Sequence, residues 1–193
     1  VFTADIAVLA APTSWYIVKA MKDFSHPGSE KKVTLDLNKS LQSTITVARN
    51  EWKYVAEMET KFDPDLPTVP CFPGELNQVF LNIITNAAHA MEPGGGILTI
   101  SLEDVELDAH QKNAAGLMVD GPFLQMTVRD TGNGIEEVLL DRIFDPYFTT
   151  KEKGEGTGLG LSVVHGIAKE CGGMVSVESK PGEGATFSVF FPK

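Results

Sequence analysis

The 193-residue sequence has few cysteines and few basic residues, and both shortages exclude classes of protein. Two cysteines, Cys71 and Cys171, are too few for a disulfide framework. Each lies in an apolar context, so we expect reduced, unreactive thiols and a cytoplasmic protein. With 16 Lys and Arg against 26 Asp and Glu, the net charge is −10 and no basic stripe is present. This charge balance excludes a general nucleic-acid-binding protein.

The sequence also lacks an apolar run long enough to cross a bilayer. Its longest apolar stretch, from Ile6 to Met21, is interrupted by Pro12, Thr13 and Ser14, and no signal-peptide pattern is visible. We therefore expect a soluble chain, which leaves open a membrane anchor in a longer parent protein. A chain of this length suits one domain with a short appendage, and it buries about 70% of its unfolded surface without disulfides.

Hydrophobic patterns with periods of two and 3.6 residues alternate along the chain and predict an α+β fold. Residues 63–70 are punctuated by proline and predict a loop, and the polar residues 106–121 predict a surface excursion. The predicted strands and helices do not alternate in a strict βαβ order, so we expect a mixed sheet covered by helices on one face. The expected strands are 33–37, 54–62, 97–107, 123–130, 174–179 and 185–191, and the expected helices are 38–50 (capped by Asn38), 73–91 and 160–173.

The first 28 residues form a separate unit in this interpretation. Residues 13–24 carry apolar side chains at helical spacing, and the His26-Pro27-Gly28 sequence ends that helix. A helix of this apolar content needs a partner, and a polar stretch separates it from the rest of the chain. We expect residues 1–28 to be one helix of a bundle whose other members are absent from this chain or come from a second copy. Residues 29–193 form the main domain.

The long helix predicted over 73–91 carries polar side chains on one face. Asn82, Asn86 and His89 lie at positions i, i+4 and i+7, while the remaining faces are apolar enough for a core helix. A single Asn on a helix is usually solvated or bonded to its own backbone. Two of them one turn apart indicate a site, and an amide oxygen is a hard ligand suited to Mg²⁺ with its waters and substrate phosphates.

A second segment, "RDTGNGI", follows the strand expected to end at Asp130. The simple interpretation is a turn, because Asp and Gly favour turns. The functional interpretation is that the Asp130 carboxylate accepts a hydrogen bond from the exocyclic amine of adenine, while Gly132 and Gly134 let the backbone approach the base. Guanine has a carbonyl at that position, so the same carboxylate would disfavour GTP.

A third segment, "GEGTGLGLS" over Gly154–Ser162, leads straight into an apolar helical pattern. Free backbone N–H groups at a helix start favour phosphates, and Lys151 is a candidate cation beside them. The Lys-Ser/Thr pair of a P-loop is absent, and the alternative interpretation is a flexible linker. A fourth segment, "GEGATF" over Gly182–Phe187, by itself predicts only a hairpin.

Together, the order and spacing of these segments resemble the five boxes of the histidine-kinase catalytic and ATP-binding domain. That family belongs to the superfamily of gyrase, heat-shock chaperone and mismatch-repair ATPases. The resemblance covers about residues 33–193 and rests on "NIITNA", "DTGNG", "FDPYF", "GTGLGL" and "GEGATF", similar to the N, G1, F, G2 and G3 boxes. It implies a two-layer α/β sandwich of the Bergerat type that binds ATP and Mg²⁺.

The resemblance also implies roles for particular residues. Asn86 would hold Mg²⁺ and act in catalysis with Asn82 and Lys151, Asp130 would bind the adenine amine, and Thr186 would join the water network near the base. Phe144 and Phe148 would anchor a mobile lid over the phosphates. The full set of residues implied to bind ATP or the metal is Asn86, His89, Asp130, Gly132, Gly134, Phe144, Phe148, Thr149, Thr150, Lys151, Gly156, Thr157, Gly158, Leu159, Gly160, Leu161 and Thr186.

One position favours a kinase over a hydrolase. Hydrolytic members of the superfamily resemble this chain four residues before the metal-binding Asn but carry a Glu there, which activates water. This chain has Asn82 at that position, and an amide cannot accept a proton at neutral pH. Transfer to a neutral imidazole depends less on such a base, because the ring nitrogen already presents a lone pair.

The histidine that would accept the phosphoryl group is not identified among the histidines of this sequence. A histidine kinase phosphorylates a histidine on its dimerisation hairpin and passes the phosphoryl group to a response regulator, and the full-length protein is expected to be a homodimer. None of His26, His89, His110 and His165 has the context of an acceptor box, whereas residues 1–28 resemble the second helix of the hairpin. We therefore expect the acceptor helix to be absent from this chain. Two alternatives stay open: an anti-sigma-type serine kinase, and a non-catalytic or hydrolytic ATP-binding module.

Overall fold

The computed structural model describes residues 32–106, 121–151 and 156–193. The helix expected within residues 1–28 and nearly all of the excursion expected over 106–121 lie outside these ranges. The described elements are β1 (Val33–Leu35), α2 (Leu37–Val47), α3 (Arg49–Trp52), β2 (Ala56–Phe62), β3 (Val69–Cys71), α4 (Pro73–Ala90), β4 (Gly96–Glu106), β5 (Pro122–Asp130), α6 (Glu137–Leu140), α7 (Gly160–Glu170), β6 (Met174–Ser179) and β7 (Ala185–Pro192).

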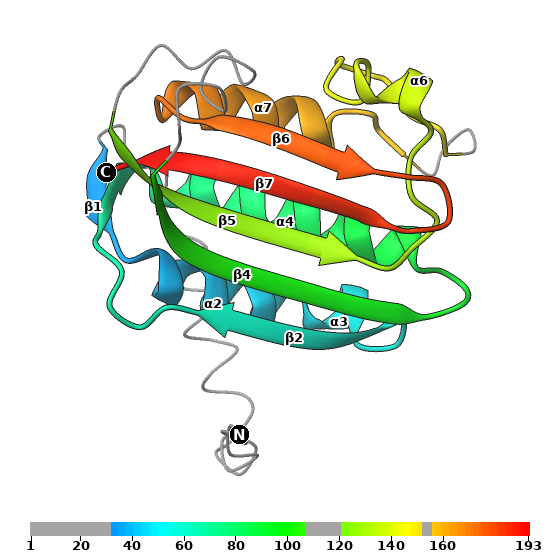
Figure 1. Cartoon of the computed structure of the whole chain (residues 1–193), viewed down its shortest axis with the longest axis horizontal. Helices are drawn as coiled ribbons and strands as arrows, with labels where there is room; N and C mark the ends of the chain where they lie inside the picture. The colour runs from blue at the N-terminus through cyan, green and yellow to red at the C-terminus, as the bar shows by residue number, and fades with distance from the viewer. Residues whose placement is uncertain (1–31, 107–120, 152–155) are drawn as a thin grey trace, which may run out of the picture.

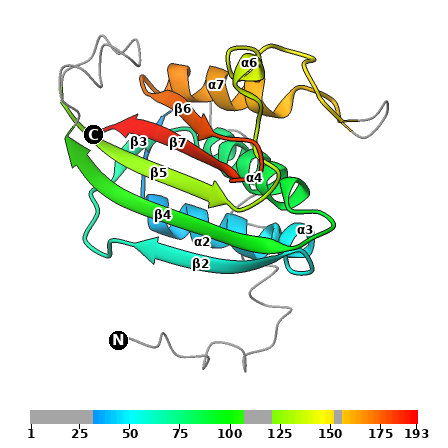
Figure 2. The same ribbon diagram turned by 45° about the vertical axis from the view of Figure 1, so that its right-hand side comes forward.

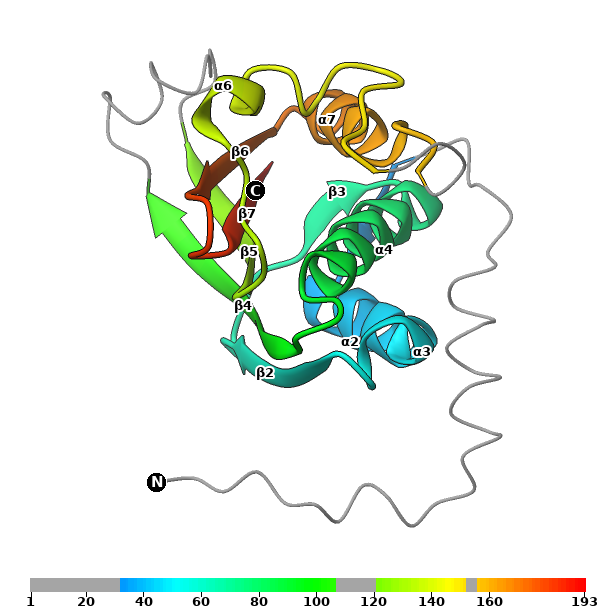
Figure 3. The same ribbon diagram turned by 90° about the vertical axis from the view of Figure 1, so that its right-hand side faces the viewer.

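Five of the strands form one mixed sheet in the order β2-β4-β5-β7-β6. The β2–β4 pair is parallel and the other three pairs are antiparallel. The helices α2, α4 and α7 lie together on one face of this sheet, as Figures 1 and 3 show. The α+β sandwich with helices on one face, expected from the sequence, is confirmed. A short antiparallel pair, β1 with β3, forms a second small sheet.

The core lies between the sheet and α4, which runs across the centre of the helical layer (Figure 2). Strand alternation points every second residue of β4 and β5 toward this helix, for example Ile100 on β4 and its partner Val128 on β5. Pro73 begins α4 at a position where its missing N–H costs nothing. The helix buries Val79, Phe80, Ile83, Ile84 and Ala87, which leaves its polar face for the site described below.

Several element boundaries differ from the sequence prediction. The α2 helix is capped by Asp36, whose side chain accepts a hydrogen bond from the Lys39 N–H at 3.1 Å, rather than by Asn38. The expected strand 33–37 therefore ends at Leu35, and the helix expected to reach residue 50 is divided into α2 and α3. Residues 63–70 were expected to form a loop, but Val69–Cys71 pairs with β1 and forms the strand β3. The short helix α6 was not predicted.

None of the helices within the described ranges combines the length and the apolar content needed to cross a membrane.

Candidate functional site

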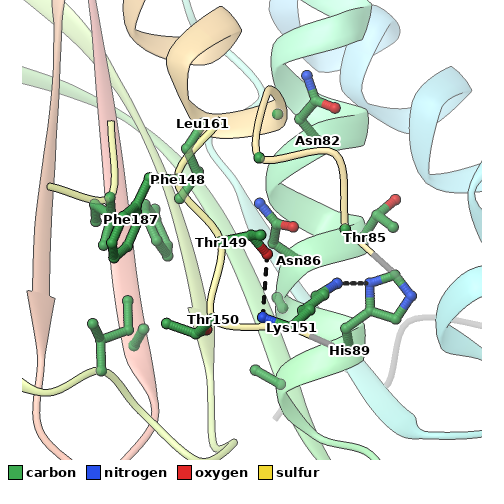
Figure 4. A pocket seen from close by; sticks show the side chains of 18 of the residues that line it. Asn82, Thr85, Asn86, His89, Phe148, Thr149, Thr150, Lys151, Leu161 and Phe187 are labelled. Carbon is green, nitrogen blue, oxygen red and sulfur yellow. Dashed lines mark hydrogen bonds between the residues drawn. The ribbon is translucent and has the colours of Figure 1, made fainter. Parts of the chain in front are cut away.

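A cavity of about 650 Å³ opens between the polar face of α4, the ends of β5 and β7, and the segments on either side of residues 152–155. Figure 4 shows the side chains of α4 on one side of it and Phe148, Phe187 and Leu161 on the other. The sequence segments with glycine-rich or amide-rich patterns, far apart in the chain, meet at this cavity.

The helix α4 contributes Asn82, Thr85, Asn86 and His89 to the cavity wall, all on the face opposite its buried residues (Figure 4). The first residue of α7, Gly160, lies directly beside the two amides. A Cβ atom at Gly160 would be 3.5 Å from the Asn82 Oδ1 and 3.8 Å from the Asn86 Nδ2. The start of α7, with its free backbone N–H groups, therefore faces the amide pair across a short gap.

Asp130 ends β5 and is 2% exposed. Its Oδ1 accepts hydrogen bonds from the backbone N–H groups of Gly132 at 2.8 Å and Ala185 at 3.2 Å. Burial raises the pKa of this carboxyl group above its ordinary value, and the two backbone hydrogen bonds oppose that shift. Because both bonds are made by Oδ1, they leave the second carboxylate oxygen for a ligand of the cavity that Asp130 lines.

The loop after Asp130 packs against the last turn of α4. The Asn133 N–H donates to the Ala90 carbonyl at 2.9 Å, and a Cβ atom at Gly132 would collide with that same carbonyl group. Only glycine allows this contact between loop and helix. The position of the Asp130 carboxylate is thus fixed relative to the amides on α4.

After α6 the chain folds back on itself, and Tyr147 and Gly158 meet through backbone atoms alone. Tyr147 has a left-handed backbone with φ 66°, and its N–H donates to the Gly158 carbonyl at 2.9 Å. Gly158 is also left-handed, with φ 65°, and a Cβ atom there would be 2.7 Å from the Tyr147 Cα. The next residue, Phe148, turns into the cavity and carries the Arg142 guanidinium 4.7 Å from its ring centre.

Lys151 connects this segment to α4. Its Nζ lies 2.8 Å from the His89 Nδ1, and its backbone N–H donates to the Thr149 Oγ1 at 3.2 Å (Figure 4). An ammonium group can only donate, so the His89 Nδ1 accepts and the ring carries its hydrogen on Nε2. A positive charge is thereby held at the mouth of the cavity beside the polar face of α4.

Most of the residues singled out from the sequence line this cavity. They are Asn82, Asn86, His89, Asp130, Gly134, Phe148, Thr149, Thr150, Lys151, Gly156, Thr157, Gly158, Gly160 and Leu161.

Four others lie outside the cavity wall: Gly132, Phe144, Leu159 and Thr186. Gly132 packs on α4, and the ring of Phe144 lies against His165 with centroids 5.6 Å apart. Thr186 lies between Ala185 and Phe187, which line the cavity, so strand alternation points the Thr186 side chain to the opposite face of the sheet.

The sequence reasoning missed part of the wall. Thr85 has helical spacing with both Asn82 and His89, so the pattern that selected those residues also contained it. The apolar members carry no pattern of their own, because only the tertiary fold brings them to the cavity. The missed residues are Leu81, Thr85, Ala87, Ala90, Asn133, Ile135, Leu139, Ile143, Ala185 and Phe187.

Comparison with known proteins identifies the family to which the chain belongs. A family model described as "Histidine kinase-, DNA gyrase B-, and HSP90-like ATPase" matches residues 73–193, which include α4, both ends of the cavity and β7. The chain belongs to this family. The resemblance drawn from the five sequence boxes is confirmed, and membership of this ATPase family supports nucleotide binding by the chain.

Individual relatives agree with this assignment. The chain is 35% identical over 178 residues to the sensor kinase CckA of Brucella abortus (strain 2308), covering 92% of this chain and 19% of that protein. Among solved structures, the catalytic domain of histidine kinase ThkA has a TM-score of 0.66 and 26% identity, covering 84% of this chain and 96% of that one. Full-length ShkA, solved in complex with AMPPNP, has a TM-score of 0.64 and 26% identity over 93% of this chain and 36% of that one. The chain thus spans about a fifth of the CckA relative and about a third of the ShkA chain.

Proposed function

We propose that this chain is the ATP-binding catalytic domain of a sensor histidine kinase, which transfers the γ-phosphoryl group of ATP to a histidine on a dimerisation helix. The observation that carries the proposal is the chemistry of the cavity wall. Two amides, Asn82 and Asn86, lie beside Gly160 at the start of α7, and Asp130 is the only carboxylate among the described residues of the wall.

Each part of the wall suits one part of ATP. The buried carboxylate of Asp130 is a hydrogen-bond acceptor for the adenine amine, and Phe148 and Phe187 supply apolar surface for the base. The start of α7 at Gly160 supplies backbone N–H groups for phosphate oxygens, and the Lys151 ammonium adds a positive charge. The resulting site extends from the sheet side of the cavity to the polar face of α4.

The same wall fits a magnesium ion held largely by the nucleotide. The described residues contain no cluster of three His, Cys, Asp or Glu side chains able to hold a metal. Asn86 offers one amide oxygen, and Mg²⁺ is typically bound through one or two protein ligands together with phosphates and water. When bound, the ion would neutralise charge on the phosphates, and Asn86 is the residue proposed to hold it.

The wall is poorly suited to activating water. Asn82 lies beside Gly160 at the start of α7, where hydrolytic relatives are expected to carry a glutamate. An amide cannot take a proton from water, and Asp130 is buried at the far side with two backbone hydrogen bonds. A neutral imidazole needs no such base before it attacks, because its unprotonated nitrogen is already a nucleophile. Positioning and charge then account for transfer.

The acceptor histidine is proposed to come from a dimerisation hairpin of the same protein. The two histidines within the described ranges are already engaged, since His89 accepts from Lys151 and His165 packs on Phe144. We propose that residues 1–28 belong to that hairpin and residues 29–193 to the catalytic domain. The proposed partners are this hairpin, a response regulator and a second copy of the full-length protein, with the catalytic domain in the cytoplasm.

The test compares this chain with the full-length protein in the presence of ATP and Mg²⁺. The chain alone should bind ATP, measured by calorimetry, and release negligible phosphate. The full-length protein should become phosphorylated on histidine, recognised by a phosphoryl group that is labile in acid and stable in base. Sustained phosphate release by the chain would indicate an ATPase instead. Acid-stable phosphoserine would indicate a serine kinase, and ATP binding without either reaction would indicate a binding module.

A further inference from the structure

A serine outside the cavity wall lies between the two segments that hold the Asp130 carboxylate. Ser179 is the last residue of β6 and pairs with Ala185, the first residue of β7. The turn between these two strands lies at the same end of the sheet as the end of β5, where Asp130 is placed (Figure 1). Ser179 is half-buried and does not line the cavity, so the roles proposed above do not include it.

The Ser179 hydroxyl is used both as an acceptor and as a donor. Its oxygen accepts a hydrogen bond from the backbone N–H of Ile135 at 2.8 Å, and the hydroxyl donates to the backbone carbonyl of Gly184 at 2.7 Å. Ile135 belongs to the loop after β5, whereas Gly184 belongs to the turn between β6 and β7. One side chain therefore bridges two backbone segments that are far apart in the sequence.

The same two segments bind the carboxylate of Asp130. Its Oδ1 accepts from the N–H of Gly132, in the loop after β5, and from the N–H of Ala185, which follows Gly184. A Cβ atom at Gly184 would collide with the Asp130 carbonyl group, so the turn lies directly against the end of β5. The Ser179 hydroxyl thus closes a ring of contacts that begins and ends at Asp130.

A second hydrogen bond joins the loop and the turn at their tips. The Gly182 N–H donates to the Asn133 carbonyl at 2.7 Å, and both residues are exposed. Water competes for an exposed hydrogen bond, whereas a bond in a less polar surrounding is electrostatically stronger. The half-buried bridge through Ser179 therefore holds the two segments together more firmly than the bond at the tips.

We propose that Ser179 is a positioning residue for base recognition, whose hydroxyl holds the loop after β5 against the β6–β7 turn and thereby fixes the Asp130 carboxylate that distinguishes adenine from guanine. This inference rests on the proposed function, in which Asp130 accepts from the adenine amine. Discrimination requires exact placement, because the carboxylate must face the exocyclic position where adenine has a donor and guanine a carbonyl. Without the bridge, the loop and the turn are free to separate, and both the attraction of adenine and the repulsion of guanine weaken.

The decisive experiment compares the affinities of the 193-residue chain and its Ser179→Ala variant for ATP and for GTP, by competition against a fluorescent ATP analogue with Mg²⁺ present. The variant should bind ATP about 3–10-fold more weakly, as the loss of one or two hydrogen bonds predicts, while its affinity for GTP should change less than about twofold. The preference for ATP should therefore decrease. A partly unfolded sample lowers both affinities by the same factor, so lost stability alone does not change their ratio.

Three further variants provide the controls. Ser179→Thr keeps the hydroxyl and should keep the ratio close to that of the wild type. Ser179→Cys, whose thiol is a weaker donor and acceptor, should give an intermediate ratio and replaces Ser179→Ala if that variant fails to fold. Ser188→Ala is the matched control, because the Ser188 Oγ accepts from the Gln125 Nε2 at 3.2 Å on the opposite face of the sheet. Its loss should lower stability without changing the ratio.

Two kinds of failure are distinguished by these titrations. The role of Ser179 is overturned if the wild type binds ATP but the ratio is unchanged in Ser179→Ala, or in Ser179→Cys where that variant replaces it. An equal change of the ratio in Ser188→Ala also overturns it. A wild-type chain that binds neither nucleotide would overturn the proposed function itself, and this inference with it.

Discussion

The backbone N–H of Tyr147 donates to the carbonyl of Gly158 at 2.9 Å, which joins the two ends of the segment carrying Thr149, Thr150 and Lys151. Both residues adopt left-handed backbone conformations, and the two chain segments are so close that no Cβ fits at Gly158. The side of the cavity where we propose that the phosphates bind is therefore held together by backbone geometry rather than by side-chain packing.

Gly158→Ala should strain this closure. We expect a loss of stability of about 1–3 kcal/mol, because alanine resists the left-handed conformation and its methyl group meets the Tyr147 backbone. ATP affinity should fall about tenfold or more, measured by calorimetry beside urea unfolding.

Gly166→Ala is the matched control for this substitution. Gly166 lies within α7, and a Cβ atom there meets nothing within 4 Å. Alanine favours a helix over glycine by about 0.5–1 kcal/mol, so this variant should gain stability and keep its ATP affinity. Equal behaviour of the two glycine variants would contradict the role assigned to the Tyr147–Gly158 closure.

Asp130→Asn should weaken ATP binding by about tenfold or more, roughly 1.4 kcal/mol, because the amide replaces one acceptor oxygen with a donor that faces the adenine amine. The shape of the side chain is kept, and the variant still has an oxygen to accept from Gly132 and Ala185. Isothermal titration with ATP measures the effect. Unchanged affinity, with the fold intact by circular dichroism, would remove Asp130 from base recognition.

The same variant should change the dependence of stability on pH. Burial raises the pKa of Asp130 above its ordinary value of 3.8, so the folded chain keeps this proton to a higher pH than the unfolded chain. Between those two pKa values the folded state binds more protons, and this group's contribution to stability therefore falls as the pH rises. Relative to Asp130→Asn, the wild type should lose stability as the pH rises above this ordinary value. Urea unfolding at several pH values measures this difference, and parallel curves would contradict it.

The sequence predicted the large elements of this fold because their hydrophobic periods are strong. The apolar positions of α4 repeat at helical spacing along its 18 residues, and β4 and β5 alternate clearly. It failed for β3, whose three residues include Pro70 and depend on pairing with β1. The N-cap of α2 was misplaced by two residues, since Asp36 and Asn38 both have suitable side chains and only the local backbone distinguishes them.

Site residues could be predicted where polar side chains repeat on one element. They could not be predicted where strand register decides which face of the sheet a side chain points to. Asn82, Asn86 and His89 were selected by helical spacing, and all three line the cavity. Thr186 was chosen from its box, but a shift of one residue along a strand moves a side chain to the other face. The neighbouring Ala185 and Phe187 face the cavity instead. Strand register is a property of the whole sheet, which a short motif does not contain.

Asn86→Ala should remove the dependence of ATP binding on Mg²⁺ and abolish phosphoryl transfer in the full-length protein. The amide lies on the polar face of α4 that lines the cavity, so its truncation should leave the melting temperature close to that of the wild type. Calorimetric titrations with ATP, with and without Mg²⁺, measure the first effect. A variant that retains both Mg²⁺ dependence and transfer would exclude Asn86 as the metal ligand.

Asn82→Glu should turn the chain toward hydrolysis. A carboxylate at this position lies beside the start of α7, where it can accept a proton from a water near the γ-phosphate. General bases contribute roughly 10²–10⁴-fold to rates, so we expect phosphate release to rise about tenfold even with imperfect placement. Asn82→Gln has the same length without the base and should show no increase. Equal phosphate release by the two variants would mean that the missing base does not limit hydrolysis.

The two hydrogen bonds that fix the Asp130 carboxylate have a consequence for inhibitor design. Its partners, Gly132 and Ala185, belong to the backbone of the sheet end and its adjoining loop, whereas Lys151 and Thr149 belong to the segment closed by Tyr147 and Gly158. A small heterocycle that binds only beside the end of the sheet would contact the same Asp130 carboxylate, whatever conformation the segment carrying Thr149 and Lys151 adopts. Substitutions at Gly132 or Ala185 that keep the backbone N–H would leave this acceptor in place, so resistance there would have to change Asp130 itself or introduce a proline.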